Sequence, residues 1–349
     1  MVYIIVLHWQ DASNTINCAE SILAQTGCRY QLVICDNGSA TDSLQAIINW
    51  ASNLPFCDTT DNYTGTGIGN NIDVNADTEN RLIERSNEPS SWTEECHPAG
   101  SIVLIRTGSN LGYAGGNNVG IRYAMRQVDT EYIWMLNNDT EVAPGALSAL
   151  LRKAKQNPEY GIIGSTLLYF YRPQHVQVLA GCRFSTWTTK IEPLGEGQLA
   201  TVAANADEAA VETKLDYVTG AAMLVSKAFI QDVGLMAEDY FLYCEEIDWA
   251  ERGRRSTKTN WQLGFARDSV VLHKVGASAE TGVSAAATKY FYTSKLRFMN
   301  RFYPSRYRWV VFMVFLQGLK KLIGGELAQA RIIIEVIRNF DTRAATRSN

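Results

Sequence analysis

The first 52 residues alternate between short apolar runs and segments whose apolar residues recur at helical spacing. β-branched apolar residues fill positions 2–7, which is typical of a buried strand. Helical spacing follows over 14–25, and the pattern repeats with a strand at 31–35 and a helix at 41–51. This order of elements is typical of an α/β domain built on a parallel sheet.

The same rhythm resumes after residue 100 and continues to residue 273. It predicts strands at 101–106, 132–136, 162–171, 176–184, 216–226 and 270–273, and helices at 116–126, 144–156, 227–233 and 243–255. Between the two parts, residues 53–100 are polar and acidic, with no sustained period. We interpret 53–100 as a surface insertion. A tolerated insertion is favoured over a lid or partner contact, because insertions concentrate in loops.

Composition narrows the class of protein. Hydrophobic residues make up 46% and charged residues 19% of the chain, as in an ordinary globular protein. The net charge of −4 argues against a general nucleic-acid-binding protein. The seven scattered cysteines form no CxxC pair, which indicates reduced thiols in a cytoplasmic protein. No signal peptide and no membrane-spanning segment is expected.

The strand at 132–136 ends abruptly in Asn137-Asn138-Asp139. In open α/β sheets, ligands bind beyond the carboxyl ends of the strands. A carboxylate beside amide oxygens suits Mg²⁺ or Mn²⁺ bridging a diphosphate. Taken alone, the segment is equally well explained as an Asn/Asp turn.

Two further segments carry polar residues where a nucleotide would bind. Asp36-Asn37-Gly38-Ser39 follows the strand at 31–35, and Asp36 is placed to accept from a pyrimidine N–H or a ribose hydroxyl. Residues 110–120 are rich in glycine and asparagine and lead into a helix. Small residues and a helix N-terminus favour a phosphate or a polar base edge. The spacing is not GxGxxG, so a dinucleotide fold is disfavoured.

Acidic and aromatic residues are concentrated at 239–252. Adjacent carboxylates in a cleft repel each other, which raises one pKa and prepares a general base. Asp248 and Arg252 stand four residues apart and can form an ion pair on one helix. The aromatic residues, including Trp249, favour a cleft over an acidic surface helix. His273 ends the strand at 270–273 beside a lysine, a combination that suits a diphosphate.

Together and in this order, these segments resemble an inverting glycosyltransferase of the GT-A fold, in particular the rhamnosyltransferase-like enzymes of the second sequence family. The resemblance covers residues 1–52 and about 101–300. It implies a mostly parallel central sheet flanked by helices. The domain would span 1–285, and a C-terminal helical extension would span 286–349.

The resemblance also implies roles for individual residues. Asp139 and His273 would bind Mg²⁺ or Mn²⁺, and Glu246 would be the general base, with Asp248 as a second candidate because the family usually has aspartate at the base position. The remaining residues fall into two groups: a nucleotide-sugar group of His8, Asp36, Asn110, Gly112, Asn117, Asn118, Asn137 and Asn138, and an acceptor and donor pocket of Gly220, Ala221, Glu245 and Trp249.

The predicted activity is transfer of a sugar, by resemblance L-rhamnose from dTDP-rhamnose, to a glycan or lipid-linked acceptor in surface polysaccharide synthesis. The alternatives are a sugar nucleotidyltransferase and a non-catalytic nucleotide- or glycan-binding protein. A nucleotidyltransferase would need a basic, glycine-rich phosphate loop near the N-terminus, and the residues after the first strand are not one.

The C-terminal segment 289–340 is rich in aromatic and basic residues around an apolar run at 310–319. Such a pattern suits helices that lie in a membrane surface. A lipid-linked acceptor would place that surface at the inner face of the cell membrane. Packing on the domain or at a homodimer interface explains it equally well.

Overall fold

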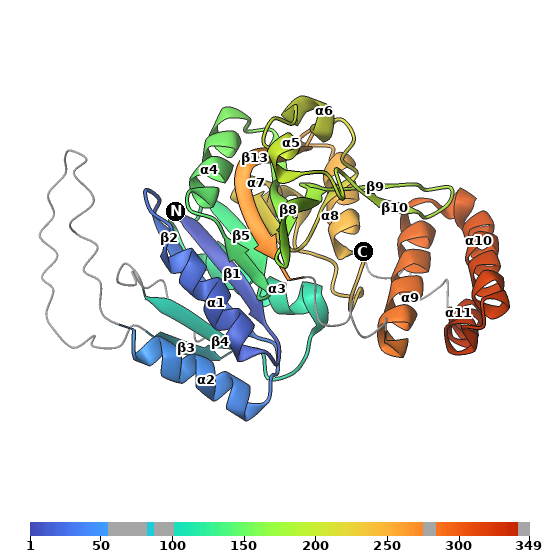
Figure 1. Cartoon of the computed structure of the whole chain (residues 1–349), viewed down its shortest axis with the longest axis horizontal. Coiled ribbons are helices and arrows are strands. Elements are labelled where there is room, and N and C mark those ends of the chain that lie inside the picture. Colours follow the sequence, from blue (N-terminus) through green and yellow to red (C-terminus); the bar gives the residue numbers. More distant parts are fainter. Residues whose placement is uncertain (55–81, 87–100, 275–283, 341–349) are drawn as a thin grey trace, which may run out of the picture.

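The computed structural model describes residues 1–54, 82–86, 101–274 and 284–340 (Figure 1). In these ranges, the helices are α1 (Ala12–Leu23), α2 (Thr41–Ser52), α3 (Gly112–Arg126), α4 (Ala146–Gln156), α5 (Ala200–Ala203), α6 (Glu208–Glu212), α7 (Lys227–Val233), α8 (Glu245–Arg254), α9 (Ala285–Phe302), α10 (Pro304–Ile323) and α11 (Leu327–Asn339). The strands are β1 (Val2–His8), β2 (Tyr30–Asp36), β3 (Leu82–Ser86), β4 (Ile102–Arg106), β5 (Tyr132–Asn137), β6 (Thr140–Val142), β7 (Tyr160–Tyr169), β8 (Arg172–Leu179), β9 (Gly181–Phe184), β10 (Ile191–Pro193), β11 (Tyr217–Val218), β12 (Ala222–Ser226) and β13 (Gln262–His273).

One large sheet organises the domain. Its strands follow the order β3-β4-β2-β1-β5-β12-β7-β13-β6, and β8 pairs with β7. The run from β3 to β5 is parallel, and β13 is parallel to β7. β12 runs antiparallel between β5 and β7. A small second sheet contains β10, β9 and β11. The predicted α/β fold with a mostly parallel central sheet is therefore confirmed.

Both faces of the large sheet are covered, which explains why its strands are continuous apolar runs. Along β1, Val2, Ile4 and Val6 pack in the same cluster as buried residues of α1, α2 and α4. The alternate residues Tyr3 and Ile5 pack with α3, α7 and α8 on the other face. The alternation follows from the two-residue period of a strand.

The structure differs from the predicted elements at several boundaries. The insertion 53–100 contains β3, which pairs in parallel with β4, and the rest of 55–100 lies outside the described residues. β13 begins eight residues before the predicted strand at 270, because it pairs along the whole of β7. α3 begins at Gly112, so part of the glycine-rich segment forms its first turn.

The C-terminal helices α9, α10 and α11 pack against one another beside the domain (Figure 1). α9 also shares an apolar cluster with Phe184, Tyr240 and Ile247 of the domain. α9 begins one residue before the predicted boundary at 285/286, and the division into two units stays a prediction. Among the described residues, no helix is both long and apolar enough to cross a membrane. The cysteines of the described ranges are all free, and Cys57 and Cys96 lie outside them.

Candidate active site

The polar turn after β5 lies beside the end of β13. β6 follows the turn and pairs antiparallel with β13, which places Thr140 opposite His273. As a result, Asp139 Oδ1 lies 3.2 Å from His273 Nε2. The Thr140 hydroxyl donates to the Asn137 carbonyl at 2.7 Å and closes the turn. The structure thus brings together the two residues that the sequence proposes as metal ligands.

The Asp139–His273 pair suits a divalent cation bound mainly by a diphosphate. His273 Nδ1 lies 2.9 Å from Gln177 Oε1, a contact that fixes the ring and directs Nε2 toward Asp139. Within the described ranges, no group of three or more His, Cys, Asp or Glu side chains is arranged to bind a metal. A Mg²⁺ ion needs only one or two protein carboxylates when substrate phosphates and water complete its shell. The residues present therefore fit a cation that arrives with the donor.

His8 is fully buried, and both of its ring nitrogens have protein partners. Nδ1 lies 2.7 Å from the Thr15 hydroxyl, and Nε2 lies 3.2 Å from the Ser43 hydroxyl. Burial lowers the pKa of His8, while the carboxylates of Asp36 and Asp11 act in the opposite direction. His8 therefore helps to shape the edge of the sheet where the nucleotide-sugar is predicted to bind. Neither ring nitrogen is left for a direct contact with the nucleotide-sugar.

The Asp36 turn and the loop before α3 are joined to each other. Asn37 donates from Nδ2 to Asn110 Oδ1 and to the Gly112 carbonyl, each at 3.1 Å. The Asp36 side chain accepts from the Ser39 backbone N–H at 3.1 Å. The two segments therefore form one surface at the carboxyl ends of β2 and β4. Asn37 belongs to the turn that follows the predicted strand at 31–35, and a short amide side chain in a turn is typical of such a linking role.

Gly112 allows this loop to approach the acidic segment. It has φ of +74°, and a Cβ there would lie 2.2 Å from the Phe241 carbonyl oxygen. The next residue, Tyr113, donates its backbone N–H to that same carbonyl at 3.0 Å. Any side chain at position 112 would push the two loops apart.

Asn117 and Asn118 are both buried on α3. The Asn118 amide donates to the Met236 carbonyl and to Glu238, each at 2.9 Å, and accepts from the Met236 N–H. Asn117 donates to the Tyr113 carbonyl at 3.0 Å, and its Oδ1 has no hydrogen-bond partner in the structure. Asn118 thus positions the 236–238 loop, while Asn117 retains an acceptor.

Glu246 lies next to the polar turn through a short series of contacts. Its Oε1 accepts from the Gly220 N–H at 3.2 Å, and the neighbouring Ala221 carbonyl accepts from the Asn137 N–H at 3.0 Å. The Tyr113 hydroxyl donates to the Gly220 carbonyl at 2.6 Å. Burial raises the pKa of Glu246 above its ordinary value. Gly220 is essential to this arrangement, because a Cβ there would lie 2.5 Å from Glu246 Oε1.

The second candidate base, Asp248, is fully engaged in structural contacts. It is 0% exposed, pairs with Arg252 and with Arg301 of α9 at 2.7 Å each, and accepts from the Tyr240 hydroxyl at 3.0 Å. The predicted Asp248–Arg252 pair is therefore present. A carboxylate with these partners is not free to meet an acceptor hydroxyl, so the geometry favours Glu246.

Two predicted pocket residues are buried. Trp249, expected to line a cleft, is 0% exposed, packs edge-on against Phe229 and donates to the Gly234 carbonyl at 2.8 Å. It belongs to the core because its helix face turns toward the sheet. Glu245 is also buried, its Oε2 has no hydrogen-bond partner in the structure, and burial with repulsion from Glu246 raises its pKa well above normal.

Two residues in the site were not identified from the sequence. Tyr113 lies within the glycine-rich segment 110–120, and its hydroxyl donates to the Gly220 carbonyl. Gln177 lies on β8, and its contact with His273 depends on the pairing of β8 and β13 with β7. No local pattern signals a contact between residues 96 positions apart.

Comparisons with known proteins agree with the predicted resemblance. Residues 93–195 match the model of Glycosyl transferase family 2. The chain is 26% identical over 223 residues to the low-salt glycan biosynthesis hexosyltransferase Agl10 of Haloferax volcanii, covering 63% of this chain and 65% of that one. It is 24% identical over 200 residues to an N-acetylglucosaminyl-diphospho-decaprenol L-rhamnosyltransferase of Mycobacterium tuberculosis, covering 50% of this chain and 59% of that one. The chain thus matches less than two thirds of either relative's length.

A solved structure shares the fold. The chain superimposes on GalNAc-T7, whose crystal structure contains UDP, GalNAc and Mn²⁺, with a TM-score of 0.56 and 11% identity. The alignment covers 99% of this chain and 55% of that one. The predicted GT-A fold and the resemblance to glycosyltransferase family 2 are confirmed.

Proposed function

We propose that this chain, with a Glycosyl transferase family 2 match over residues 93–195, is an inverting hexosyltransferase. It would transfer a sugar from a nucleotide-sugar to a hydroxyl of a glycan or lipid-linked acceptor. The observation that carries the proposal is the link from the Asp139 turn through Ala221 and Gly220 to Glu246. A pair suited to a diphosphate-bound cation, Asp139 and His273, and a carboxylate base, Glu246, are connected by these contacts, as a single displacement requires.

In the proposed reaction, Glu246 removes the proton from the acceptor hydroxyl. The oxygen then attacks the anomeric carbon from the face opposite the diphosphate, the bond between that carbon and the diphosphate oxygen breaks, and the nucleoside diphosphate leaves. One displacement therefore inverts the configuration. The raised pKa makes the ionised Glu246 carboxylate a stronger base than an exposed glutamate. The Gly220 N–H orients that carboxylate.

Asp139 and His273 would bind Mg²⁺ or Mn²⁺ together with the diphosphate of the donor. When bound, such a cation neutralises charge that develops on the leaving diphosphate. Gln177 would keep His273 in the required orientation. Asp36 and the loop at 110–118 would contact the nucleotide, with Asn37 and Asn118 as positioning residues.

L-Rhamnose from dTDP-rhamnose is our specific proposal for the donor. It is supported by the sequence resemblance and by the Mycobacterium tuberculosis relative, which is named an L-rhamnosyltransferase. The name of that relative also specifies N-acetylglucosaminyl-diphospho-decaprenol, a decaprenol-linked sugar, as its substrate. We therefore propose that this enzyme builds a cell-envelope glycan at the inner face of the cell membrane.

Donor turnover tests the proposal directly. Purified protein is incubated with dTDP-rhamnose, UDP-hexoses and GDP-mannose, with and without Mn²⁺, and release of the nucleoside diphosphate is measured. We expect release from one donor class, increased by Mn²⁺ and by a diphosphate-linked acceptor. Formation of a nucleotide-sugar from a nucleoside triphosphate and a sugar phosphate would instead show a nucleotidyltransferase. Tight binding of a donor with no release would show a binding protein.

A further inference from the structure

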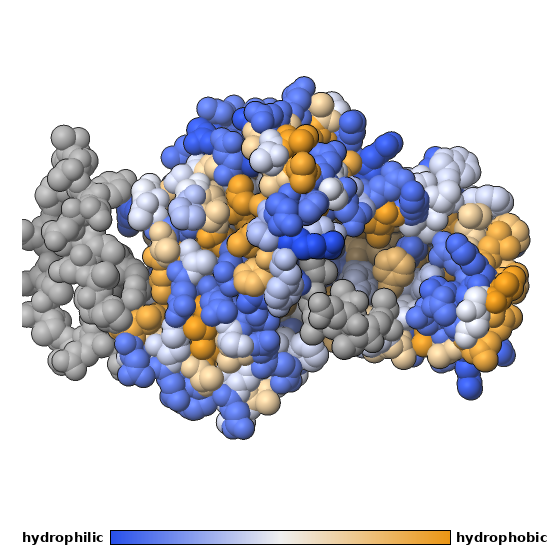
Figure 2. Space-filling model, viewed as in Figure 1, coloured by the Kyte–Doolittle hydropathy of each residue, from blue (hydrophilic) through white to orange (hydrophobic). Residues whose placement is uncertain are grey.

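Helix α10 has one face that packs on the neighbouring helices and one that faces solvent. Val310, Val314 and Gly318 are buried, and a Cβ at Gly318 would lie 3.2 Å from Ile333 of α11. The opposite face carries large apolar side chains that are 39–87% exposed: Trp309, Phe312, Phe315, Leu316 and Ile323. Figure 2 shows hydrophobic side chains gathered at the right-hand edge of the molecule, over α10 and α11. We call the exposed side chains of α10 the outer face.

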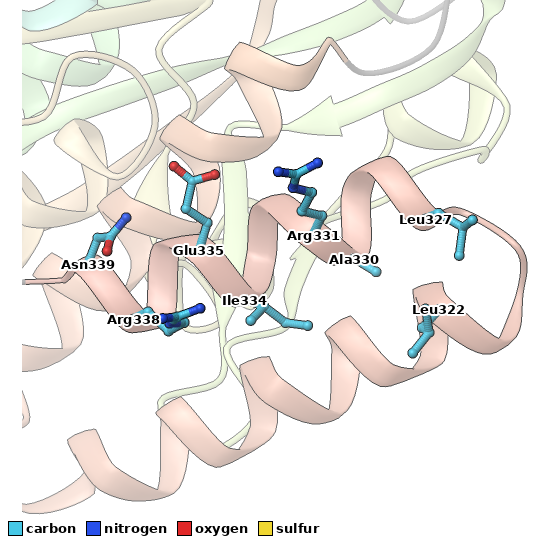
Figure 3. Close-up of a pocket in the computed structure, with 8 residues that line it drawn as sticks. All are labelled: Leu322, Leu327, Ala330, Arg331, Ile334, Glu335, Arg338 and Asn339. Atoms are coloured by element: carbon cyan, nitrogen blue, oxygen red, sulfur yellow. The ribbon is translucent and has the colours of Figure 1, made fainter.

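Neighbouring elements extend the outer face at both ends. The Trp309 indole N–H donates at 3.0 Å to the carbonyl of Trp187, whose side chain is 58% exposed. At the other end, Leu322 and Leu327 line a cavity of about 550 Å³ together with residues of α11. Figure 3 shows Ile334 between α10 and α11, while Arg331 extends from α11 away from α10. Tryptophans at the rim of an apolar surface are characteristic of a membrane–water interface.

The charge of these helices is opposite to that of the chain. Residues 285–323 contain eight basic residues and no acidic one, although the whole chain has a net charge of −4. Arg308 and Lys320 are exposed at the two ends of the outer face. Cations that flank an apolar face provide electrostatic attraction to anionic lipids in addition to apolar burial.

Charge also decides between a bilayer and a second copy of the chain. In a two-fold symmetric dimer through the outer face, each patch would meet an identical patch. Arg308 and Lys320 would then approach cations of the other copy, and α10 has no acidic side chain to pair with them. An anionic lipid surface presents the opposite charge. We propose that the outer face of α10, with Trp187 and Leu327, binds the surface of an anionic membrane.

Contact of α10 with a membrane would be connected, through α9, to the segment 239–248 that contains Glu246. Arg301 of α9 pairs with Asp248 of α8 at 2.7 Å, and the Ser294 hydroxyl donates to the Leu242 carbonyl at 2.8 Å. The rings of Phe241 and Tyr290 stack at 4.7 Å. Helix α9 therefore packs both on α10, which would bind the membrane, and on the segment that leads to Glu246. The inference rests on the proposed location at the membrane, which it extends by naming the surface and the lipid charge.

Vesicle flotation tests the surface without any donor or acceptor. We expect the wild-type chain to float with phosphatidylcholine vesicles that contain phosphatidylglycerol, and less with phosphatidylcholine alone. Binding should weaken as salt is raised. The double variant Phe312→Glu and Leu316→Glu should lower partitioning by about tenfold or more, because it removes apolar area and adds negative charge. Both side chains face solvent, so the fold should tolerate the changes.

Val128→Glu is the matched control, because Val128 is 79% exposed on the domain and lies outside the outer face. It should float like the wild type. Two results would overturn the inference: no flotation of the wild type with anionic vesicles, or equal flotation of the double variant. A dimer in lipid-free solution that the double variant dissociates, without vesicle binding by the wild type, would show that a second copy covers the face. Release of nucleotide from a soluble donor, measured without vesicles, separates failure of this surface from failure of the proposed activity.

Discussion

Replacing Glu246 and Asp248 by their amides separates the catalytic base from the structural acid. Both substitutions keep the size of the side chain and remove one ionisable carboxylate. In Glu246→Gln, the amide oxygen can still accept from the Gly220 N–H, which the wild-type carboxylate does at 3.2 Å. The fold and the donor site should therefore remain intact. Only proton removal is lost, and a general base contributes about 10²–10⁴-fold to the rate.

Asp248→Asn should instead destabilise the protein. Asp248 accepts from two arginines and a tyrosine, and an amide has only one oxygen to accept these bonds. Breaking a buried ion pair in this way costs about 3–5 kcal/mol. For a chain of this size, that loss corresponds to a fall in the unfolding midpoint on the order of 10 °C.

The assay measures three quantities for each variant: kcat for nucleotide release with acceptor, Kd for the donor, and the unfolding midpoint. Glu246→Gln should lower kcat by about 10²–10⁴-fold while the other two quantities stay near the wild-type values. Asp248→Asn should lower the midpoint and retain activity well below it. Glu246→Asp keeps a carboxylate one methylene shorter and should retain part of the activity. Full activity of Glu246→Gln with a stable but inactive Asp248→Asn would refute the assignment of the base.

Four further predictions concern the same site. Gly220→Ala should lower kcat by about tenfold or more, because its Cβ would lie 2.5 Å from Glu246 Oε1 and would displace that carboxylate. The substitution removes no ionisable group. An unchanged donor Kd and an unchanged pH profile would show that only the position of Glu246 is altered. The kcat of the wild type should rise with pH through the raised pKa of Glu246, since only the ionised form is a base, and this limb should vanish in Glu246→Gln. His273→Ala and Asp139→Asn should each weaken Mn²⁺ binding in the presence of nucleoside diphosphate by about tenfold or more, measured by calorimetry, and unchanged affinity would contradict their role as ligands. Burial holds a proton on Glu245 in the folded chain at a pH where the unfolded chain has lost it, so stability contributed by Glu245 is lost as pH rises above about 4.5. Glu245→Gln should therefore flatten the fall of the unfolding midpoint between acidic and neutral pH.

Several site contacts follow from local sequence together with general rules of sheet topology. An apolar run that stops at Asn137 predicts a polar turn at the carboxyl end of a strand, where ligands bind. The structure has that turn, and it has Asp139 beside His273. The resemblance to glycosyltransferases named the same pair. The polar turn is encoded within a few residues, so a single sequence reveals it, whereas the pairing of Asp139 with His273 is implied by the resemblance alone.

The predicted roles are wrong for residues whose type is equally common in an open cleft and in a packed core. The sequence predicts that Trp249 lines a cleft, yet its side chain is 0% exposed. Asp248 was a candidate base, yet arginines from its own helix and from α9 surround it. The local sequence around an acidic or aromatic residue does not show whether its side chain lies in an open cleft or in a packed core. Only the packing of α9 on α8 decides which one applies.

Local sequence patterns are enough to predict the α/β class, the order of most strands and helices, and the segments where polar residues end apolar strands. These features depend on the period of hydrophobic positions and on turn residues, which act over a few residues. The tertiary structure decided the pairing of β3 with β4, the contact of Gln177 with His273, and which acid of α8 remains free beside Gly220. It also decided that α10 leaves its outer face in solvent. Each of these depends on residues far apart in the chain meeting in space, and no local period carries that information.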